Sequence, residues 1–234
     1  FEFEKYIPFP IENCIVDLDI IEKRPDGTVN VLIVTARKEY IEEQIKIVKA
    51  AGLTPIMICI DALALHKVFT DTPLHKKDKS YVLLNMGCTK TNLVIIRDGL
   101  PVFLRDINIG GMNFTNTIAD HMDIPIAKAE EMKLLPPDGA DLLSTVSIDS
   151  NSLVNEIELS MEYAKKNCGI SEIENMYLSG GTSKLKGLKE FLEANLKMPV
   201  RAWTPFEKVK QSRKDDILKT YAPEATLAVG LALS

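Results

Sequence analysis

The sequence contains few of the residues that bind metal ions or form disulfide frameworks. Its four cysteines include no C-x-x-C pair, and its three histidines lie far apart with no acidic ligand pattern beside them. These spacings exclude zinc-finger and redox-motif proteins, and we expect no metal site. Three of the cysteines lie inside apolar segments, which is typical of reduced, packed thiols in a cytoplasm. The residues concerned are Cys14, Cys59, Cys88, Cys168, His66, His75 and His121.

The chain also lacks a long apolar run, a signal pattern and a basic block. No run approaches the roughly 20 apolar residues of a membrane span, and the first residues, FEFEKYIPFP, do not form a charged-then-apolar signal. A net charge of −5 without a basic block argues against nucleic acid as a partner. The 234 residues, 46% hydrophobic and 26% charged, suit one large globular domain or two lobes. Because no initiating Met is present, we expect an excised fragment or a processed form.

Two common nucleotide-binding fingerprints are missing as well. The sequence has no G-x-G-x-x-G and no G-x-x-x-x-G-K-[ST], which argues against a Rossmann or a P-loop protein. It does have two glycine-bearing turns, at residues 87–90 and 179–182, each directly after an apolar strand. A strand followed by a glycine turn and a helix can present backbone N–H groups to a phosphate. The two turns together therefore indicate a nucleotide site in the second part of the chain.

The stretch from residue 81 to residue 111 reads as three strands in a row. Apolar runs of strand length lie at residues 81–86, 91–97 and 100–107. Asp98-Gly99 has the residues of a two-residue hairpin turn. The earlier turn, Gly87-Cys88-Thr89-Lys90, brings backbone N–H groups and hydroxyls to one point, and Lys90 either contacts phosphate there or stays solvated at the tip. The alternative is a plain meander whose turn happens to contain glycine.

Periodicity and turn residues predict the remaining elements. Before residue 80 we expect a possible helix tail at 1–6, a hairpin of 14–22 and 29–35 closed by Pro25-Asp26-Gly27-Thr28, helices at 37–51 and 62–69, a buried strand at 55–60 and a linker at 75–79. After residue 111 we expect helices at 113–122, 126–135, 153–168, 188–196 and 223–233, short strands at 175–178 and 199–202, and a loop at 141–150. Alternating strands and helices place the chain in the α/β class.

Several stretches resemble a known family. NMGCTKTNLVIIRDG, YLSGGTSKLKGL and APEATLAVGLAL, in this order, are similar to the second half of an actin-like ATPase. YIPFPIE, ARKEYIEEQIKIVKAAGLTPIMICIDALAL and RDGLPVFLRDINIGG resemble the PilM family of type IV pilus assembly proteins, relatives of the cell-division protein FtsA. The resemblance covers nearly the whole chain. It implies an α/β actin-like (ribonuclease H-like) fold, with a partial first lobe that carries a small inserted subdomain and a complete second lobe.

The resemblance also implies a domain division. The inserted subdomain would occupy residues 1–53, the rest of the first lobe and a linker 54–79, and the second lobe 80–234, with a helical insertion at about 126–170. Members of the family begin with a glycine-bearing hairpin that holds phosphates from the first lobe. Nothing of that kind precedes Phe1, so we expect a fragment that lacks this side of the nucleotide cleft.

The same resemblance implies a site for ATP with Mg²⁺. Asn85 stands where the family usually has Asp, and a neutral amide holds a Mg²⁺-bound water less well than a carboxylate. The family's arginines after the helix glutamate are replaced here, so we expect neither a catalytic residue nor ATP turnover. Gly180 and its neighbours either contact the adenosine or let the chain pack closely, and for Gly110-Gly111 we favour packing. The implied cofactor-binding residues are Asn85, Gly87, Cys88, Thr89, Thr91, Glu156, Gly180, Gly181 and Thr182.

By resemblance, we expect a cytoplasmic scaffold of type IV pilus or related secretion assembly. It would bind the cytoplasmic tail of a PilN-like inner-membrane protein through a groove within residues 6–51, and so lie at the inner face of the membrane. A pilus motor ATPase and a second copy of the chain are further expected partners. The alternatives are an ATP-hydrolysing FtsA-type protein, although APEATLAVGLALS lacks the basic residues of a membrane helix, or a sugar-kinase relative.

Overall fold

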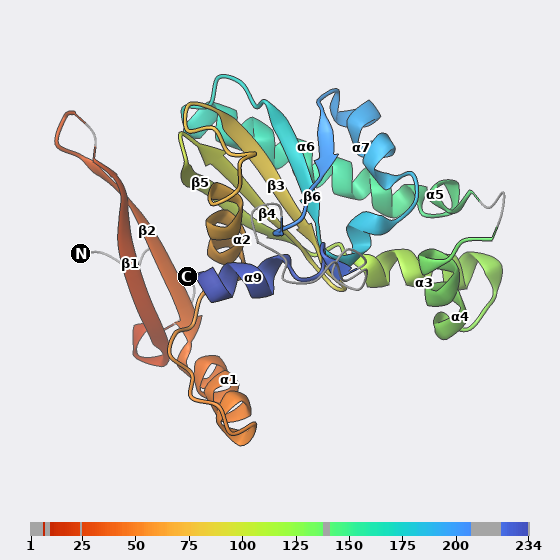
Figure 1. Ribbon diagram of the computed structural model, residues 1–234, viewed down its shortest axis with the longest axis horizontal. Helices are drawn as coiled ribbons and strands as arrows, with labels where there is room; N and C mark the ends of the chain where they lie inside the picture. The colour runs from red at the N-terminus through yellow and green to blue at the C-terminus, as the bar shows by residue number, and fades with distance from the viewer. Residues whose placement is uncertain (1–6, 8–9, 24, 138–140, 207–220, 234) are drawn as a thin grey trace. The chain divides into compact units, whose positions relative to one another are not determined.

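A computed structural model describes residues 7, 10–23, 25–137, 141–206 and 221–233 of the chain (Figure 1). The chain divides into two compact units, Phe1–Ile58 and Cys59–Ser234, and each unit is described by itself. The possible helix tail at residues 1–6 lies outside the described residues.

The first unit is built around an antiparallel hairpin of β1 (Cys14–Lys23) and β2 (Val29–Arg37). In the turn, the Asp26 carboxylate accepts hydrogen bonds from the Thr28 N–H at 2.9 Å and from the Thr28 hydroxyl at 2.6 Å. Gly27 has a φ of +84°, which glycine adopts without steric cost. The predicted hairpin and its turn are thus confirmed. The short helix η2 (Ile11–Asn13) precedes the hairpin and α1 (Lys38–Ala50) follows it.

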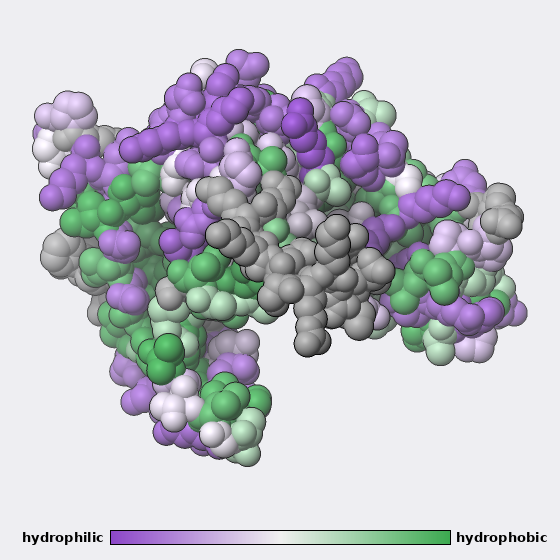
Figure 2. Space-filling model, viewed as in Figure 1, coloured by the Kyte–Doolittle hydropathy of each residue, from purple (hydrophilic) through white to green (hydrophobic). Residues whose placement is uncertain are grey.

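The hairpin presents apolar side chains on its surface. Ile15, Leu18 and Ile20 of β1 have 45%, 51% and 48% of their surface exposed. Figure 2 shows hydrophobic residues in green, interleaved with hydrophilic ones in purple, along this hairpin. A two-stranded ribbon is marginal by itself in water and gains stability when one face packs against something else. The first unit therefore carries apolar surface on a narrow scaffold.

The predicted strand at residues 55–60 is wrong. These residues form no strand, and Ile56, Met57 and Ile58 are 97%, 51% and 49% exposed. An apolar run of this length suits a buried strand only where a neighbouring strand supplies hydrogen-bond partners. Within the described part of the chain, neither sheet includes this segment. It forms an irregular connection that leads into α2 (Asp61–Thr70) of the second unit.

The second unit contains a five-stranded sheet with the strand order β5-β4-β3-β6-β7. The first three strands of this unit, β3, β4 and β5, form an antiparallel meander, while β6 lies parallel to β3 and β7 lies parallel to β6. The predicted strands and the two predicted turns of the meander are confirmed. The strands are β3 (Ser80–Met86), β4 (Thr91–Arg97), β5 (Leu100–Ile107), β6 (Asn175–Ser179) and β7 (Val200–Ala202).

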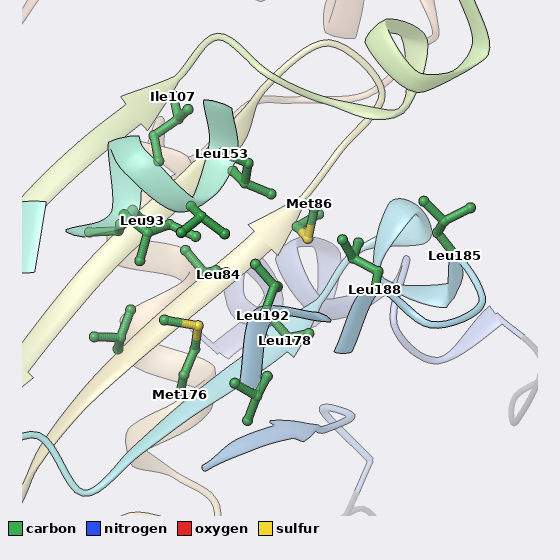
Figure 3. Packing of buried hydrophobic residues seen from close by; sticks show 14 of the residues in the cluster. Leu84, Met86, Leu93, Ile107, Leu153, Met176, Leu178, Leu185, Leu188 and Leu192 are labelled. Atoms are coloured by element: carbon green, nitrogen blue, oxygen red, sulfur yellow. The ribbon is translucent and has the colours of Figure 1, made fainter. Parts of the chain in front are cut away.

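Helices cover both faces of this sheet (Figure 1). Leu84 and Met86 of β3 point into a core that α3, α6 and α7 close, where they meet residues such as Leu188 (Figure 3). Tyr81 and Leu83, from the same strand, point into the core beneath α2 and α9. Because successive residues of a strand face opposite sides, a sheet covered on both faces gives continuous apolar runs in the sequence. The helices are α3 (Gly111–Met122), α4 (Ile126–Leu134), α5 (Leu142–Thr145), α6 (Ser147–Asn167), α7 (Leu188–Leu196) and α9 (Thr226–Leu233).

The predicted loop at residues 141–150 is also wrong. The short helix α5 and the first turn of α6 occupy this segment. The Asp141 side chain accepts a hydrogen bond from the Ser144 N–H at 3.2 Å and so caps α5. Leu142 and Val146 are buried in the core. This burial stabilises the helical turns, which the weak apolar periodicity of the segment did not predict.

An aromatic cluster closes the face beneath α2 and α9. The Phe69 ring centroid lies 5.4 Å from that of Tyr81, 4.9 Å from that of Tyr177 and 5.3 Å from that of Trp203. Each such pair contributes about 0.5–1.5 kcal/mol beyond the burial of its area. On the same face, α9 approaches α2 so closely that a Cβ atom on Gly230 would overlap the carbonyl group of Ala64. The packing of this face of the sheet therefore depends on contacts between aromatic rings and on the close approach of the α2 and α9 backbones.

We expect the free energy of unfolding to fall as the pH falls below about 6.5, the ordinary pKa of histidine. Burial lowers the pKa of His66, and this outweighs the hydrogen bond that its Nε2–H donates to the Gly99 carbonyl at 2.8 Å. Below pH 6.5 the unfolded chain takes up this proton more readily than the folded chain, so protons favour unfolding until the lowered pKa is reached. Urea unfolding at about pH 7.5 and about pH 5.5 measures the loss.

The variant His66→Gln should lose less stability between these two pH values, because a glutamine amide can donate to Gly99 and does not titrate. The variant His121→Gln, at an exposed position, is the control and should behave like the unchanged protein. Equal losses in all three proteins would contradict the assignment.

Candidate functional site

A cavity of about 390 Å³ opens in the second unit where β3 and β6 end. Six of the nine residues that the sequence analysis assigned to nucleotide binding line it together. These six are Asn85, Gly87, Cys88, Gly180, Gly181 and Thr182. The other lining residues are Gly111, Glu130, Lys133, Leu134, Glu224 and Leu227.

Strand pairing brings the two glycine turns together. β3 and β6 are parallel neighbours, with Asn85 opposite Ser179, so the turns that follow both strands leave the sheet at the same edge. Gly180 has a φ of +84°, and a Cβ atom there would overlap the Met86 carbonyl group. Only glycine combines this backbone conformation with such a close approach. The packing interpretation of this glycine and a binding role are therefore compatible, because the close contact is what brings the turns to one place.

The turn at residues 87–90 is held by its neighbours. The Gly87 N–H donates to the Lys90 carbonyl at 2.9 Å. The Gly87 carbonyl accepts from the Gly111 N–H at 2.9 Å and from the Thr182 hydroxyl at 2.8 Å. The start of α3 and the second glycine turn thus fix the first turn from two sides. A Cβ atom on Gly110 would lie 2.6 Å from the Cys88 carbonyl oxygen, which supports the packing role that the sequence favoured for this position.

Three predicted residues do not line this cavity. Thr89 is exposed, and Thr91 is buried with its hydroxyl donating to the Ile109 carbonyl at 2.7 Å. Glu156 lies on α6, where its carboxylate pairs with Arg105 of β5. In this arrangement the Thr91 hydroxyl and the Glu156 carboxylate already have partners inside the protein.

The Asn85 side chain belongs to a network of amides. Its Nδ2 donates to Asn92 Oδ1 at 3.1 Å, and its Oδ1 accepts from the Ser179 hydroxyl at 3.3 Å. Asn92 Nδ2 in turn donates to Asp106 Oδ1 at 2.8 Å. An aspartate at position 85 would place two acceptors against each other, because it has no N–H for Asn92. The amide at position 85 is therefore matched to its surroundings.

Lys90 contacts carboxylates at the tip of the turn. Its Nζ lies 2.9 Å from Asp106 Oδ2 and 3.0 Å from Asp61 Oδ2. Burial acts to lower the pKa of Lys90, but the hydrogen bonds and charges of Asp106 and Asp61 outweigh burial and raise it. The lysine is neither simply solvated nor directed at a phosphate, since two carboxylates hold its charge.

Sequence reasoning missed a buried cation on α4. Lys133 is 8% exposed, and its Nζ lies 2.7 Å from Glu130 Oε2, 2.8 Å from the Thr115 hydroxyl and 3.0 Å from the Gly111 carbonyl. Burial acts to raise the pKa of Glu130, but the hydrogen bonds from Lys133 and Thr115 and the charge of Lys133 outweigh it and lower that pKa. The Glu-x-x-Lys spacing can be read from the sequence. The burial of the lysine, however, results from the packing of α4 against α3.

The cavity walls thus combine two glycine turns, a buried lysine paired with a partly exposed glutamate, and two leucine side chains. Glycine turns suit phosphates, carboxylates accept from hydroxyl or amino groups, and leucines pack against an apolar ring. Among the residues with a described position, no three His, Cys, Asp or Glu side chains lie close enough together to hold a metal ion. Walls of this composition would suit a small ligand with an anionic end and a flat end.

The chain is similar in sequence and in structure to proteins of type IV pilus assembly. The family model for type IV pilus assembly protein PilM matches residues 1–234. A chain in the solved structure of a PilM-PilN type IV pilus biogenesis complex is 28% identical in sequence to the present chain. The match covers 99% of this chain and 69% of that chain, with a TM-score of 0.87.

More distant structures share the fold. The ethanolamine utilization protein EutJ of Carboxydothermus hydrogenoformans is 19% identical, with a TM-score of 0.64 over 85% of this chain and 62% of that one. MreB5 of Spiroplasma citri bound to AMPPNP is 11% identical, with a TM-score of 0.59 over 84% of this chain and 64% of that one. The present chain thus spans less than two thirds of the length of each of these two relatives. Together, the structural comparisons confirm the predicted actin-like fold.

Proposed function

Because the chain belongs to the PilM family of type IV pilus assembly proteins, we propose that it is a scaffold that binds the cytoplasmic tail of a PilN-type membrane protein. The observation that carries the proposal is the likeness, over 99% of this chain, to a protein solved as a PilM-PilN complex. The scaffold would link the pilus assembly machinery to the inner face of the membrane through that partner. In the parts of the chain that the structure describes, no helix is long and apolar enough to cross a membrane.

A cavity in the first unit is the proposed docking place for the tail. It has a volume of about 660 Å³ and lies between the residues that precede β1 and the start of α1. It mixes charges of both signs, which suits the polar backbone and side chains of an extended peptide. The exposed apolar side chains of β1 add surface on the same unit. The cavity is lined by Pro10, Asn13, Arg37, Lys38, Glu39 and Glu42.

Reversing the charge of Lys38 should weaken tail binding. Lys38 is exposed and lines the cavity, so Lys38→Glu changes the electrostatics of the docking place without disturbing a core. We expect the affinity for a peptide of the partner's tail to fall about tenfold, the effect of losing a good interface contact. Isothermal titration calorimetry with the peptide measures it.

The matched control is Lys46→Glu, which makes the same charge change at an exposed position further along α1. It should leave the affinity within about twofold of the unchanged protein, because an exposed charge away from the contact is screened by salt. Equal weakening by both variants would show a general charge effect and contradict docking at the cavity. Absence of peptide binding to the unchanged protein would overturn the scaffold proposal itself.

We further propose that the cavity of the second unit binds a nucleotide such as ATP. The residues fit the parts of such a ligand, since Cys88 and Gly181 of the two turns line the cavity without being buried, so phosphates can approach the backbone there. Glu130 can accept from ribose hydroxyls, and Leu134 and Leu227 can pack against a base. When bound, the nucleotide would supply a polyphosphate, and residues of the two glycine turns would hold it.

The proposed role of this cavity is binding and not turnover. Phosphoryl transfer needs cations that neutralise the developing charge on the phosphate. Lys133, which lines the cavity, and Lys90, in the turn beside it, have other partners, because Lys90 is held by Asp61 and Asp106 and Lys133 by Glu130 and its neighbours. Bound nucleotide would therefore act as a structural ligand that orders the second unit.

A further inference from the structure

Side-chain donors around the nucleotide cavity already have partners inside the protein. The three N–H donors of the Lys133 ammonium match three acceptors, one each from Gly111, Thr115 and Glu130. The Thr182 hydroxyl donates to the Gly87 carbonyl at 2.8 Å. What the cavity wall offers a ligand from its side chains is therefore mainly hydrogen-bond acceptance.

Glu224 is the acceptor on the α9 side of the cavity. It just precedes α9, and its Cγ would lie 3.4 Å from a Cβ atom on Gly181, so it stands beside the second glycine turn. Its Oε1 accepts a hydrogen bond from Lys184. Lys184 Nζ also lies 5.4 Å from the centroid of the Tyr221 ring, a cation–π distance. The carboxylate is thus oriented from one side by a cation that is itself held in place.

The second oxygen of this carboxylate remains for a ligand. Within the described ranges, Glu224 Oε2 makes no hydrogen bond in the protein. Glu130, the other carboxylate of the cavity, is shared by Lys133 and Thr115 through its Oε2 and stands on α4. The two acceptors therefore belong to different parts of the chain, α4 and the segment just before α9.

Apolar side chains line the cavity on the Glu224 side and on the α4 side, so a base can lie between them. Leu227, three residues after Glu224, lines the cavity and packs partly against the core beneath α9. Leu134, on the α4 side, is 60% exposed and lines the same cavity. The faces of a flat heterocycle need apolar neighbours, while its edge needs hydrogen-bond partners. A base between the two leucines would meet an acceptor at its edge.

We propose that Glu224 accepts a hydrogen bond from the exocyclic 6-amino group of a purine and so selects adenine nucleotides over those with a 6-oxo group. The inference rests on the nucleotide site proposed above. Adenine presents an N–H donor at position 6, whereas hypoxanthine presents a carbonyl oxygen there. A carbonyl set against a carboxylate leaves both acceptors without a donor, which lowers the affinity for the 6-oxo base.

The test compares ATP with ITP, which differ at this edge of the base alone. Calorimetric titration of the protein should give ATP an affinity at least about tenfold higher than ITP. In Glu224→Gln the two affinities should come within about threefold of each other, because the glutamine amide can accept from an amino group or donate to a carbonyl. The control, Glu193→Gln, changes an exposed glutamate of α7 in the same way and should keep the original ratio.

The possible outcomes separate the two proposals. If ATP and ITP bind the unchanged protein equally, or if Glu224→Gln keeps the original ratio, the selection by Glu224 is wrong while nucleotide binding stands. If GTP binds more tightly than ATP, the assignment of a 6-amino group is wrong. If none of these nucleotides binds, the proposed nucleotide site fails and the inference fails with it.

Discussion

Replacing Gly230 by valine is expected to lower the free energy of unfolding of the second unit by at least about 3 kcal/mol. The reason is the approach of α9 to α2, where even a Cβ atom on Gly230 would overlap the Ala64 carbonyl. Backbone cannot move aside as the end of a flexible side chain can. The two helices would have to separate, and the aromatic cluster around Phe69 beneath them would lose part of its cover.

Thermal and urea unfolding followed by circular dichroism measure this loss. Ala228→Val is the matched control, because it adds a valine to the same helix at an exposed position. Its expected cost is only the helix propensity difference, below about 1 kcal/mol. If the two variants lose the same free energy of unfolding, the close approach of α2 and α9 is not the reason why residue 230 must be glycine.

Replacing Lys133 by methionine should lower the free energy of unfolding by about 2 kcal/mol, because buried acceptors lose a donor. Methionine keeps much of the volume of the side chain but removes three donors. The Gly111 carbonyl, the Thr115 hydroxyl and the Glu130 carboxylate would then lose the cation that joins them. Because the same cation positions Glu130 at the cavity, we also expect nucleotide affinity to fall at least about tenfold. Urea unfolding and calorimetry measure the two effects separately.

A second lysine of α4 provides the comparison. Lys128 pairs with Glu131 at 2.9 Å with the same i,i+3 spacing, but both side chains are more than half exposed. Lys128→Met should therefore change stability by less than about 1 kcal/mol and leave nucleotide affinity unchanged. Comparable losses in the two variants would mean that burial of Lys133 is not the cause.

The strands and most helices could be predicted because burial leaves a pattern in the sequence. β3 and β4 are covered on both faces, and this produced the continuous apolar runs from which they were predicted. The same rule failed at residues 55–60, where Ile56 is almost fully exposed and the run pairs with no strand among the described residues. An apolar run indicates burial, but it does not indicate what the residues will pack against.

The candidate site was partly predictable for a similar reason. Turns that follow strands are local features, so Gly87 and Gly180 could be assigned from the sequence. The partners of a charged side chain depend on distant residues, and no local signal indicated that Asp61 would contact Lys90 or that Glu224 would stand beside Gly181. The amide network of Asn85 likewise depends on Ser179. Tertiary packing decides these contacts.

The pairing of β3 with β6 also has a consequence for the order of folding. Asn85 and Ser179, which hydrogen-bond across this pair, are separated by 94 residues in the chain. Closing a loop of this length costs conformational entropy before any contact is made, so this pairing should form late, after the local meander β3-β4-β5. During synthesis the ribosome must release the chain beyond Glu224 before all walls of the cavity exist. A ligand that bridges the two turns would therefore bind only the finished sheet, and its binding would report completion of folding.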